Sequence, residues 1–326
     1  MTEAFASLDV AMATYHREDR LPELLPLLVA QGDAAMAAIG STFRFRVIVV
    51  DNDPQGSARE VVTGMGDPRI HYVVETNPGV TNARNRALTE AHETDLLAFI
   101  DDDELPHEDW LAQLLLARER YGVDAVAGPV YPILESDPEP WVTASRCYAE
   151  PQRARLRTGE PIRRAGTGNM LLDLRTVRRL GVRFDQRFGM TGGEDSVFTQ
   201  QLSDGGARMV WCAEAVADHR VPEERATRRY LLDRNYSLGN SGVRAEVFFA
   251  GSGKSRVLTQ LKWGVTCLGS VVKGTLQTLW GRLRGSLATR AAGELRVAGG
   301  LGGLAGLVGA IVTPYGDAAA PEETTS

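Results

Sequence analysis

The chain has 326 residues, of which 43% are hydrophobic and 24% charged, and its formal net charge at pH 7 is −6. This composition is typical of a globular protein with enough apolar side chains for one large core or two smaller ones, and it excludes a disordered chain, a collagen-like fibre and a polytopic membrane protein. A net acidic chain also lacks the basic surface that bulk nucleic-acid binding requires, so we expect no nucleic-acid partner.

The cysteines and the first residues bear on the cellular compartment. Cys147, Cys212 and Cys267 are isolated and no CxxC pair exists, which indicates neither a disulfide scaffold nor a zinc site. The opening MTEAFASLDV has no basic region followed by a long apolar stretch, so it does not resemble a signal peptide. We therefore expect a cytoplasmic protein.

Strand-like and helix-like stretches alternate along the first half of the chain. The predicted elements are a strand at Leu8–Ala13, a helix at Leu21–Gln31, a strand at Phe45–Val50, a short helix at Ala58–Thr63, a strand at Ile70–Val74, a helix at Thr81–Ala91, a strand at Leu96–Ile100, a helix at His107–Arg120 and a strand at Val123–Val130. This alternation predicts an α/β fold with a mostly parallel sheet flanked by helices. In such sheets, ligands bind at the carboxyl ends of the strands.

Polar residues follow these strand ends. The first strand runs into Thr14–Arg17 without the GxGxxG pattern, which disfavours a dinucleotide-binding dehydrogenase. Asp51–Asp53 follows the second strand, Asn77–Gly79 the third and Asp101–Asp103 the fourth. Any one of these groups is explained equally well by loop chemistry or a helix cap. Together they place several carboxylates on one edge of the sheet.

Carboxylates gathered this closely repel one another unless a cation joins them. Divalent ions such as Mg²⁺ take oxygen ligands and bridge substrate phosphates. Arginine is the other common phosphate partner, and Arg17 and Arg84 fall in the same segments. The pattern therefore favours a metal-bound nucleotide diphosphate.

A second acidic group lies downstream. Glu194 and Asp195 precede the helical sequence VFTQQLSDGG, and His219 follows the strand-like RMVWC by several residues. Acids at a helix start also arise from simple helix capping, and a lone histidine is usually structural. Imidazole beside carboxylates is, however, a good ligand for Mn²⁺ or Mg²⁺.

Several of these stretches resemble inverting family 2 glycosyltransferases of the GT-A fold, and most of all bacterial exopolysaccharide enzymes of the succinoglycan-glucosyltransferase type. The resemblance covers about residues 7–240 and is carried by FRVIVVDNDP, ETNPGVTNARNRAL, LLAFIDDDELPHEDWL, GTGNMLL, TGGEDSVFTQQL and AVADHRVPEERAT. It implies a GT-A domain over residues 1–250, with a nucleotide-binding half at about 7–130 and an acceptor half at about 131–250.

The resemblance also implies roles for single residues. On the donor side it places Thr14 and Arg17 at the nucleotide-facing turn, Asp51 against the uracil base, and Gly79, Arg84 and Asn85 along the nucleotide. Asp101 and Asp103 match the DxD motif, whose second acid is the usual metal ligand, and Asp102 is left with an open role. His219 matches a metal ligand found in part of the family.

On the acceptor side, Asp195 matches the catalytic base and Glu194 a neighbour that orients the acceptor. Gly168 and Asn169 match the strand that floors the acceptor side. The resemblance thus implies a divalent-metal-dependent inverting glycosyltransferase that moves a sugar from a UDP-sugar to a hydroxyl of a glycan or lipid-linked oligosaccharide in bacterial polysaccharide synthesis. The alternatives are a nucleotidyltransferase and a non-catalytic module that binds sugar nucleotides.

The last part of the chain differs in charge. Residues 254–296 hold eight basic side chains and one acidic one. An apolar stripe at steps of three or four runs through Val257, Leu261, Val265, Leu268, Val272, Leu276, Leu279, Leu283 and Leu287. We interpret 251–312 as a basic amphipathic helical tail and 313–326 as a disordered C-terminus. Such a tail suits an anionic membrane surface at the inner face of the plasma membrane, while packing on the protein or on a second copy is the alternative.

Two features of this tail have competing interpretations. Gly251-Ser252-Gly253-Lys254-Ser255 resembles the end of a phosphate-binding P-loop, but Phe248 stands where the full motif requires glycine, so we interpret the segment as a linker. Residues 297–316 carry no charge over 20 positions, a length that could span a membrane. They contain seven glycines and Pro314, which favours an interfacial or packed segment.

Overall fold

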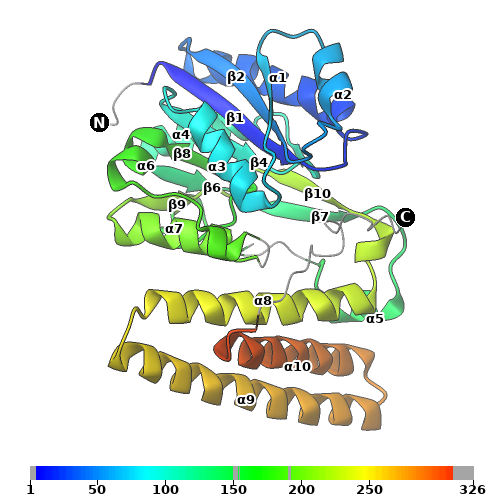
Figure 1. The fold of residues 1–326 in the computed structure, drawn as a ribbon. Helices are drawn as coiled ribbons and strands as arrows, with labels where there is room; N and C mark the ends of the chain where they lie inside the picture. The colour runs from blue at the N-terminus through cyan, green and yellow to red at the C-terminus, as the bar shows by residue number, and fades with distance from the viewer. Residues whose placement is uncertain (1–4, 150–152, 154, 190–191, 311–326) are drawn as a thin grey trace, which may run out of the picture. The chain divides into compact units, whose positions relative to one another are not determined.

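The structure, a computed structural model, describes residues 5–149, 153, 155–189 and 192–310 (Figure 1). Chain contacts divide it into two units. The first unit comprises Met1–Pro132, Pro151–Gln186 and Glu194–Arg220, and the second comprises Ile133–Glu150, Arg187–Gly193 and Val221–Ser326. Each unit is described by itself.

The first unit is built around a seven-stranded sheet. Its strands lie in the order β3 (Ile70–Val74), β2 (Arg44–Asp51), β1 (Ser7–Thr14), β4 (Leu96–Ile100), β8 (Asn169–Asp173), β6 (Ala125–Ala127) and β9 (Met209–Trp211). Neighbouring strands are parallel except β8, which runs antiparallel to both β4 and β6. The predicted α/β fold with a mostly parallel sheet is confirmed.

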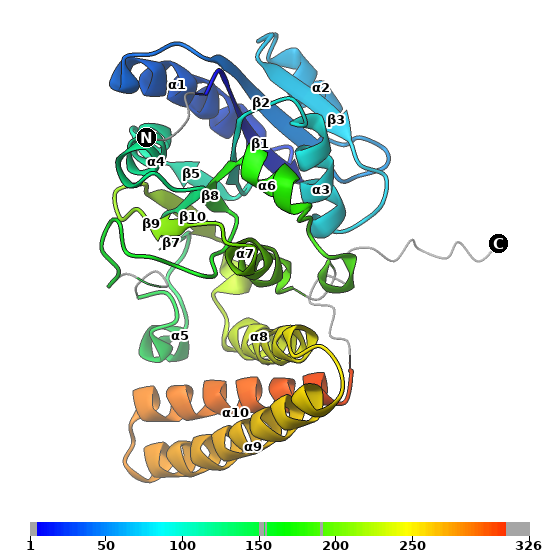
Figure 2. The ribbon, with the colours of Figure 1, turned by 90° about the vertical axis from the view of Figure 1, so that its left-hand side faces the viewer.

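Helices cover both faces of this sheet (Figure 2). Successive residues of a strand point to opposite faces of the sheet. The two clusters of buried apolar side chains, one on each face, therefore show which helices cover which face. Leu8, Val10 and Met12 of β1 pack with α1 (Leu21–Ile39) and α4 (Trp110–Tyr121), and Ala11 packs on the other face. That other face is covered by α3 (Val80–Glu90), α6 (Leu174–Leu180) and α7 (Glu194–Asp204). Short helical segments lie at α2 (Arg59–Gly64), Gln186–Phe188 and Glu223–Arg225.

One predicted strand is wrong in extent. The stretch Val123–Val130 forms two strands, β6 and β7 (Val130–Leu134), rather than one. The break falls at Gly128 and Pro129: a Cβ on Gly128 would collide with the Ala215 carbonyl, and proline has no N–H for a sheet ladder. After the break the chain enters a three-stranded sheet in the order β5 (Glu104–Pro106), β10 (Ala217–Val221) and β7.

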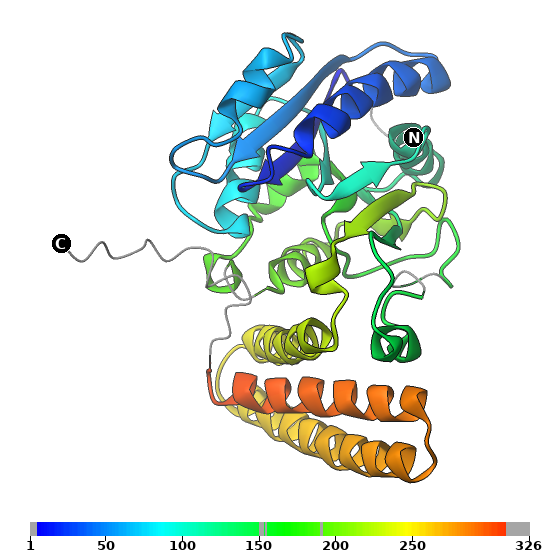
Figure 3. The ribbon, with the colours of Figure 1, turned by 90° about the vertical axis from the view of Figure 1, so that its right-hand side faces the viewer.

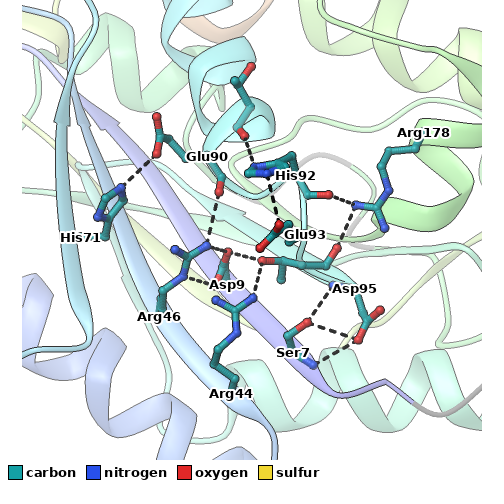
Figure 4. Close-up of polar contacts among 12 residues, drawn as sticks. Ser7, Asp9, Arg44, Arg46, His71, Glu90, His92, Glu93, Asp95 and Arg178 are labelled. Atoms are coloured by element: carbon teal, nitrogen blue, oxygen red, sulfur yellow. Dashed lines mark hydrogen bonds and ion pairs between the residues drawn. The ribbon is translucent and has the colours of Figure 1, made fainter.

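The amino ends of the central strands carry a polar network (Figure 4). The fully buried Asp9 carboxylate accepts hydrogen bonds from Arg46 at 3.1 and 2.6 Å. Asp95 accepts from the Ser7 backbone and hydroxyl, both at 3.2 Å, and Arg178 donates to the His92 carbonyl at 3.0 Å. Because ligands bind at the carboxyl ends of such sheets, we assign this network to stability.

The second unit is mainly helical (Figure 3). It contains α5 (Pro140–Ser145), α8 (Arg228–Phe249), α9 (Lys254–Leu283) and α10 (Leu287–Leu307). Glycines let α10 approach its neighbours closely: a Cβ on Gly302 would collide with the Tyr236 carbonyl of α8, and one on Gly293 would lie 2.5 Å from Thr278 Oγ1 of α9. The uncharged 297–310 stretch is therefore largely a packed helix.

The predicted tail can be compared with these helices. Residues 254–307 form α9 and α10, joined by a short turn. Within the described ranges, no helix is both long enough and apolar enough to cross a membrane. The predicted disordered segment 313–326 lies outside the described residues. Chain contacts place α8 in the second unit, which begins its last segment at Val221. The net charge of the sequence instead changes sign near residue 250. The domain boundary expected from charge therefore stays a prediction.

Candidate active site

The carboxyl ends of β1 and β4 bring Arg17 against the aspartate run. Arg17 Nη1 lies 2.6 Å from Asp102 Oδ1 and 2.9 Å from Asp103 Oδ2. On the other side of Asp103, His219 Nδ1 lies 3.2 Å from Oδ1. His219 lies within β10, opposite Glu104 of β5, because those two strands are paired antiparallel. Residues from three separate segments thus meet at Asp103.

Arg84 of α3 joins a second group of carboxylates in the same unit. Its Nη1 lies 2.7 Å from Glu194 Oε1 and 2.5 Å from Asp195 Oδ1, and its Nη2 lies 3.1 Å from Asp101 Oδ1. Thr167 Oγ1 also donates to Asp195 Oδ1 at 2.5 Å. Among the described residues, the hydrogen bonds to Asp195 go to Oδ1, so Oδ2 is left for a ligand. Arg84 therefore links the aspartate run after β4 to the acidic pair at the start of α7.

Gly168 and Glu104 complete the floor of this region. A Cβ on Gly168 would lie 2.7 Å from Asp101 Oδ2 and 2.8 Å from Glu104 Oε1, so only glycine leaves room for both carboxylates. Glu104 is buried, and Asp101 N donates to its Oε2 at 3.3 Å. The sequence analysis gave Glu104 no role, although its place as the fourth acid after a buried strand was a usable signal.

Burial raises the pKa of several of these acids, because the charged form loses hydration. Burial, together with the nearby Asp195 charge, raises the pKa of Glu194 to about 7, against the opposing effect of Arg84. Burial also raises the pKa of Asp102 to about 6, opposed by Arg17. For Arg84, burial would lower the pKa, but the carboxylates around it raise it overall. Arg84 therefore stays charged while Glu194 can be neutral near pH 7.

The surroundings of Glu194 Oε2 are consistent with a neutral Glu194 side chain. Its Oε2 is buried and has no hydrogen-bond partner among the residues that the structure describes. A buried carboxylate oxygen without a donor is costly, whereas a protonated oxygen can donate to a bound ligand. The arrangement is therefore suited to donating a hydrogen bond to a bound ligand.

Other expected donor residues shape the loops around the site. Asp51 is fully buried and accepts from Tyr72 Oη at 2.7 Å and from Ala58 N at 2.9 Å, and its predicted contact with a base stays a prediction. Asn52, which the sequence analysis did not single out, accepts from Gly79 N at 2.8 Å. Gly79 has φ 113°, a backbone conformation that favours glycine at the start of α3.

Two further predicted side chains are hydrogen-bonded within the protein, and a third is buried without such a bond. Thr14 lies at the end of β1, paired with Asp51 in register, and its Oγ1 has no hydrogen-bond partner among the described residues. Asn85 bonds both the backbone N–H and the carbonyl of Phe184, at 3.0 and 2.9 Å. The buried Asn169 amide donates to the Pro129 and Ala215 carbonyls and accepts from Trp110. Asn85 and Asn169 thus make hydrogen bonds within the protein, and their predicted roles beside the nucleotide and the acceptor stay predictions.

The residues around Asp103 can be tested against a divalent cation. Asp103 and His219 form an oxygen and nitrogen pair at 3.2 Å, which fits one ion. No group of three or more His, Cys, Asp and Glu side chains with metal-binding geometry occurs among the described residues. Mg²⁺ and Mn²⁺ commonly take one or two protein ligands and complete their shell with phosphate oxygens and water. The pair therefore fits a cation that arrives with a diphosphate.

Comparison with known proteins decides the family. The family model described as "Glycosyl transferase family 2" matches residues 9–172, which include the whole of the aspartate run. The chain belongs to glycosyl transferase family 2. The glycosyltransferase is also 34% identical over 241 residues to the succinoglycan biosynthesis protein ExoM of Rhizobium meliloti (strain 1021), covering 73% of this chain and 74% of ExoM. The predicted family and enzyme class are thereby confirmed.

Solved structures support the fold of this glycosyltransferase. S. aureus TarS matches with a TM-score of 0.51 at 14% identity, over 78% of this chain and 41% of that one. A shorter TarS, residues 1–349 in complex with UDP-GlcNAc, matches with a TM-score of 0.50 at 13% identity, over 88% of this chain and 90% of that one. GalNAc-T7 with UDP, GalNAc and Mn²⁺ matches with a TM-score of 0.51 at 13% identity, over 76% of this chain and 50% of that one. The chain thus spans 41% of that longer TarS chain and 50% of the GalNAc-T7 chain, and the predicted GT-A fold is confirmed.

Proposed function

We propose that this glycosyltransferase moves a sugar from a UDP-sugar to a hydroxyl of a glycan or lipid-linked oligosaccharide, with inversion at the anomeric carbon and with a divalent cation, in bacterial exopolysaccharide synthesis. The observation that carries the proposal is the position of Arg84. It contacts Asp101 of the aspartate run and both acids of the Glu194–Asp195 pair. One edge of the first unit thereby presents phosphate-binding and proton-accepting groups together.

The donor side follows from the residues around Asp103. Asp103 and His219 would hold Mn²⁺ or Mg²⁺, which when bound neutralises negative charge on the departing diphosphate. Arg17, held by Asp102 and Asp103, adds a fixed positive charge at the same edge. Gly79 and the loop positioned by Asn52 would border the nucleotide.

The acceptor side follows from Glu194 and Asp195. Arg84 and Thr167 fix Asp195 by one oxygen, so its Oδ2 can take the proton of an attacking hydroxyl. A protonated Glu194 can donate to the acceptor through its unpartnered Oε2. A single base with in-line attack gives inversion, because no covalent enzyme intermediate forms.

The relatives support the choice of substrates. ExoM is a succinoglycan biosynthesis protein, so we propose an exopolysaccharide acceptor for this chain. The solved complexes of TarS with UDP-GlcNAc and of GalNAc-T7 with UDP and Mn²⁺ support a UDP-sugar and a divalent cation.

A product assay tests this proposal against its alternatives. The full chain is incubated with Mn²⁺ and a panel of UDP-sugars, with and without lipid-linked acceptor, and the released phosphates are separated. Release of UDP is expected. Release of pyrophosphate would instead identify a nucleotidyltransferase, and binding without release of either would identify a non-catalytic module.

We further propose that α9 attaches the enzyme peripherally to an anionic membrane surface. The apolar stripe predicted from the sequence lies exposed along this helix, with Val265 75% and Leu283 81% exposed. The basic side chains Lys262 and Lys273 are exposed on the same helix. Basic amphipathic helices of this kind bury their apolar face at the headgroup boundary of anionic lipid.

Vesicle flotation tests this attachment. We expect binding to phosphatidylcholine vesicles containing phosphatidylglycerol, weaker binding to phosphatidylcholine alone, and loss of binding in a Leu268→Asp, Leu276→Asp variant. Leu238→Asp, at an exposed leucine of α8, is the matched control. A variant that still floats contradicts the attachment, and a wild-type dimer that the α9 variant dissociates would assign the stripe to a second copy.

A further inference from the structure

The second unit contains a cavity of about 390 Å³ that the proposed reaction does not use. It lies between the end of α8, the start of α9 and the end of α10, next to the turn at Arg187 and Phe188. Cavities of this size are typical of small-ligand sites, for which about 300 to 1,000 Å³ is usual. The lining residues are Arg187, Phe188, Arg244, Val247, Phe248, Gly251, Arg256, Gln260, Gly306, Leu307 and Gly309.

The charge of this cavity is one-sided. Arg187, Arg244 and Arg256 line it, and none of the described lining residues is acidic. Two of these guanidinium groups lie over aromatic rings, Arg187 at 4.5 Å from the Phe248 centroid and Arg244 at 5.3 Å from that of Phe188. A guanidinium group over a ring can still donate hydrogen bonds from its edge, as Arg244 does to the Arg187 carbonyl.

Arg244 has donor capacity that the protein leaves unused. Its Nη2 donates to the Arg187 carbonyl at 3.0 Å, but its Nη1 is buried and has no partner among the described residues. Burial also lowers the pKa of Arg244, because the charged form is partly desolvated without a carboxylate to offset the loss. An anionic ligand would satisfy both the donor and the charge.

The start of α9 adds positive charge beside the cavity. The helix begins at Lys254 after Gly253, which makes no side-chain capping bond, and its first turn contains no acid. Lys254 and Arg256 instead place positive charge at the positive end of the helix dipole, an arrangement that an anion relieves. The Gly251–Ser255 segment, interpreted from sequence as a linker, thus forms one wall of a basic cavity through Gly251.

We propose that this cavity binds a phosphate or diphosphate group. Arginine edges suit the tetrahedral oxygens of phosphate, and the aromatic rings suit an organic group attached to it. The location allows two sources of the same chemistry. The exposed stripe of α9 begins at Val257, next to Arg256, which fits a lipid-borne phosphate, and the exposed side chain of Arg256 equally admits a phosphate carried by a soluble molecule.

Titration of the full chain tests the proposal directly. The ligand is inorganic pyrophosphate in the presence of EDTA, and the proteins are wild type, an Arg244→Gln, Arg256→Gln variant and an Arg229→Gln, Arg234→Gln control. The control removes the same charge from exposed positions of α8, outside the cavity lining. We expect the Kd for pyrophosphate to rise about tenfold or more in the cavity variant and to stay within about twofold in the control.

A second measurement shows whether a loss of pyrophosphate affinity comes from misfolding or from damage to the UDP site. All three proteins should bind UDP with Mn²⁺ equally, since the variants leave the first unit unchanged. Arg256→Gln alone changes an exposed side chain and should reproduce part of the loss even if the double variant is unstable. Equal pyrophosphate affinity in wild type, single variant and double variant would overturn the proposal whether or not the enzyme transfers sugar.

Vesicles identify the source of the phosphate. Wild type and variants are floated with phosphatidylcholine containing either phosphatidic acid or phosphatidylglycerol at equal surface charge. A preference for phosphatidic acid that the cavity variant loses supports a lipid-borne phosphate. Weaker pyrophosphate binding with no such preference supports a phosphate on the acceptor or in solution.

Discussion

Arg84 Nη1 donates to Asp195 Oδ1 at 2.5 Å although the two residues stand 111 positions apart in the chain. The contact is possible because α3 and α7 cover the same face of the sheet and both begin near the carboxyl ends of its strands. Through its other nitrogen, Arg84 also reaches Asp101. The groups proposed for the donor side and for the acceptor side therefore share one buried guanidinium.

Replacing Arg84 with lysine should damage both activity and stability. Lysine keeps the charge but cannot make the forked contacts to three carboxylates. We expect transfer to fall by about tenfold or more and the free energy of unfolding to fall by about 1–3 kcal/mol, because buried acceptors lose their donor. Arg86→Lys, two positions along the same helix at a partly exposed pair with Glu90, should change stability by less than about 1 kcal/mol. Wild-type turnover in the Arg84 variant would contradict its linking role.

Asp195→Asn should separate chemistry from binding. The amide keeps the shape of the side chain but cannot accept the proton of the acceptor hydroxyl. We expect kcat to fall by about 10²–10⁴, with the Kd for UDP and Mn²⁺ within about twofold of wild type. Asp204→Asn, at the other end of α7 and paired there with Arg163, serves as the control. If the Asp195 variant turns over normally, another group is the base.

Much of the first unit could be predicted from sequence because its strands are apolar runs that end abruptly in polar residues. Leu96–Ile100 followed by Asp101 is an example, and the strand was predicted correctly. The break within the predicted strand Val123–Val130 could not be predicted from sequence. It depends on contact between Gly128 and the Ala215 carbonyl, which is far away in the chain.

For the candidate site too, sequence predicts the residue types better than their surroundings. The sequence motifs and the family resemblance pointed to Asp103, Asp195 and His219 as candidates, and their roles stay predictions. Whether a polar side chain faces a ligand or the protein depends on neighbours that sequence does not reveal. Asn169 and Asp51 face inward, whereas Glu104 faces the same glycine as Asp101.

Gly168→Ala should disturb the site through steric contact alone. Its Cβ would lie 2.7 Å from Asp101 Oδ2 and 2.8 Å from Glu104 Oε1, so both carboxylates must shift. We expect loss of stability of about 1–3 kcal/mol with a marked fall in transfer. Gly64→Ala, at the end of α2, is the control, because its Cβ would meet no atom of the described residues within 4 Å. Thermal unfolding and initial rates of both variants check the expectation, and equal behaviour of the two would argue against a steric requirement at Gly168.

Removal of the cation should weaken donor binding through Asp103. EDTA should lower the affinity of wild type for UDP, and Mn²⁺ should restore it. In Asp103→Asn, calorimetry should show Mn²⁺-dependent UDP binding weakened by about tenfold or more, because a carboxylate ligand is lost. Asp218→Asn is the control: its side chain points to the other side of β10 from His219 and pairs with His107 at 3.1 Å. If neither EDTA nor Asp103→Asn weakens the affinity for UDP, a cation site at Asp103 is excluded.

Glu194 should make stability depend on pH with a definite sign. Burial raises its pKa to about 7 in the folded protein, above the value of 4.5 expected for an unhindered glutamate. The folded state therefore holds the proton more tightly, so this residue stabilises the protein fully below about pH 4.5 and loses that contribution as the pH rises through about 7. Urea unfolding across this range should show a smaller decline in Glu194→Gln than in wild type, since glutamine stays neutral. Glu60→Gln, at an exposed position of α2, should follow the wild-type profile. A Glu194→Gln profile parallel to wild type would mean that the carboxyl is ionised in the folded protein throughout, and Oε2 would then have to act as an acceptor.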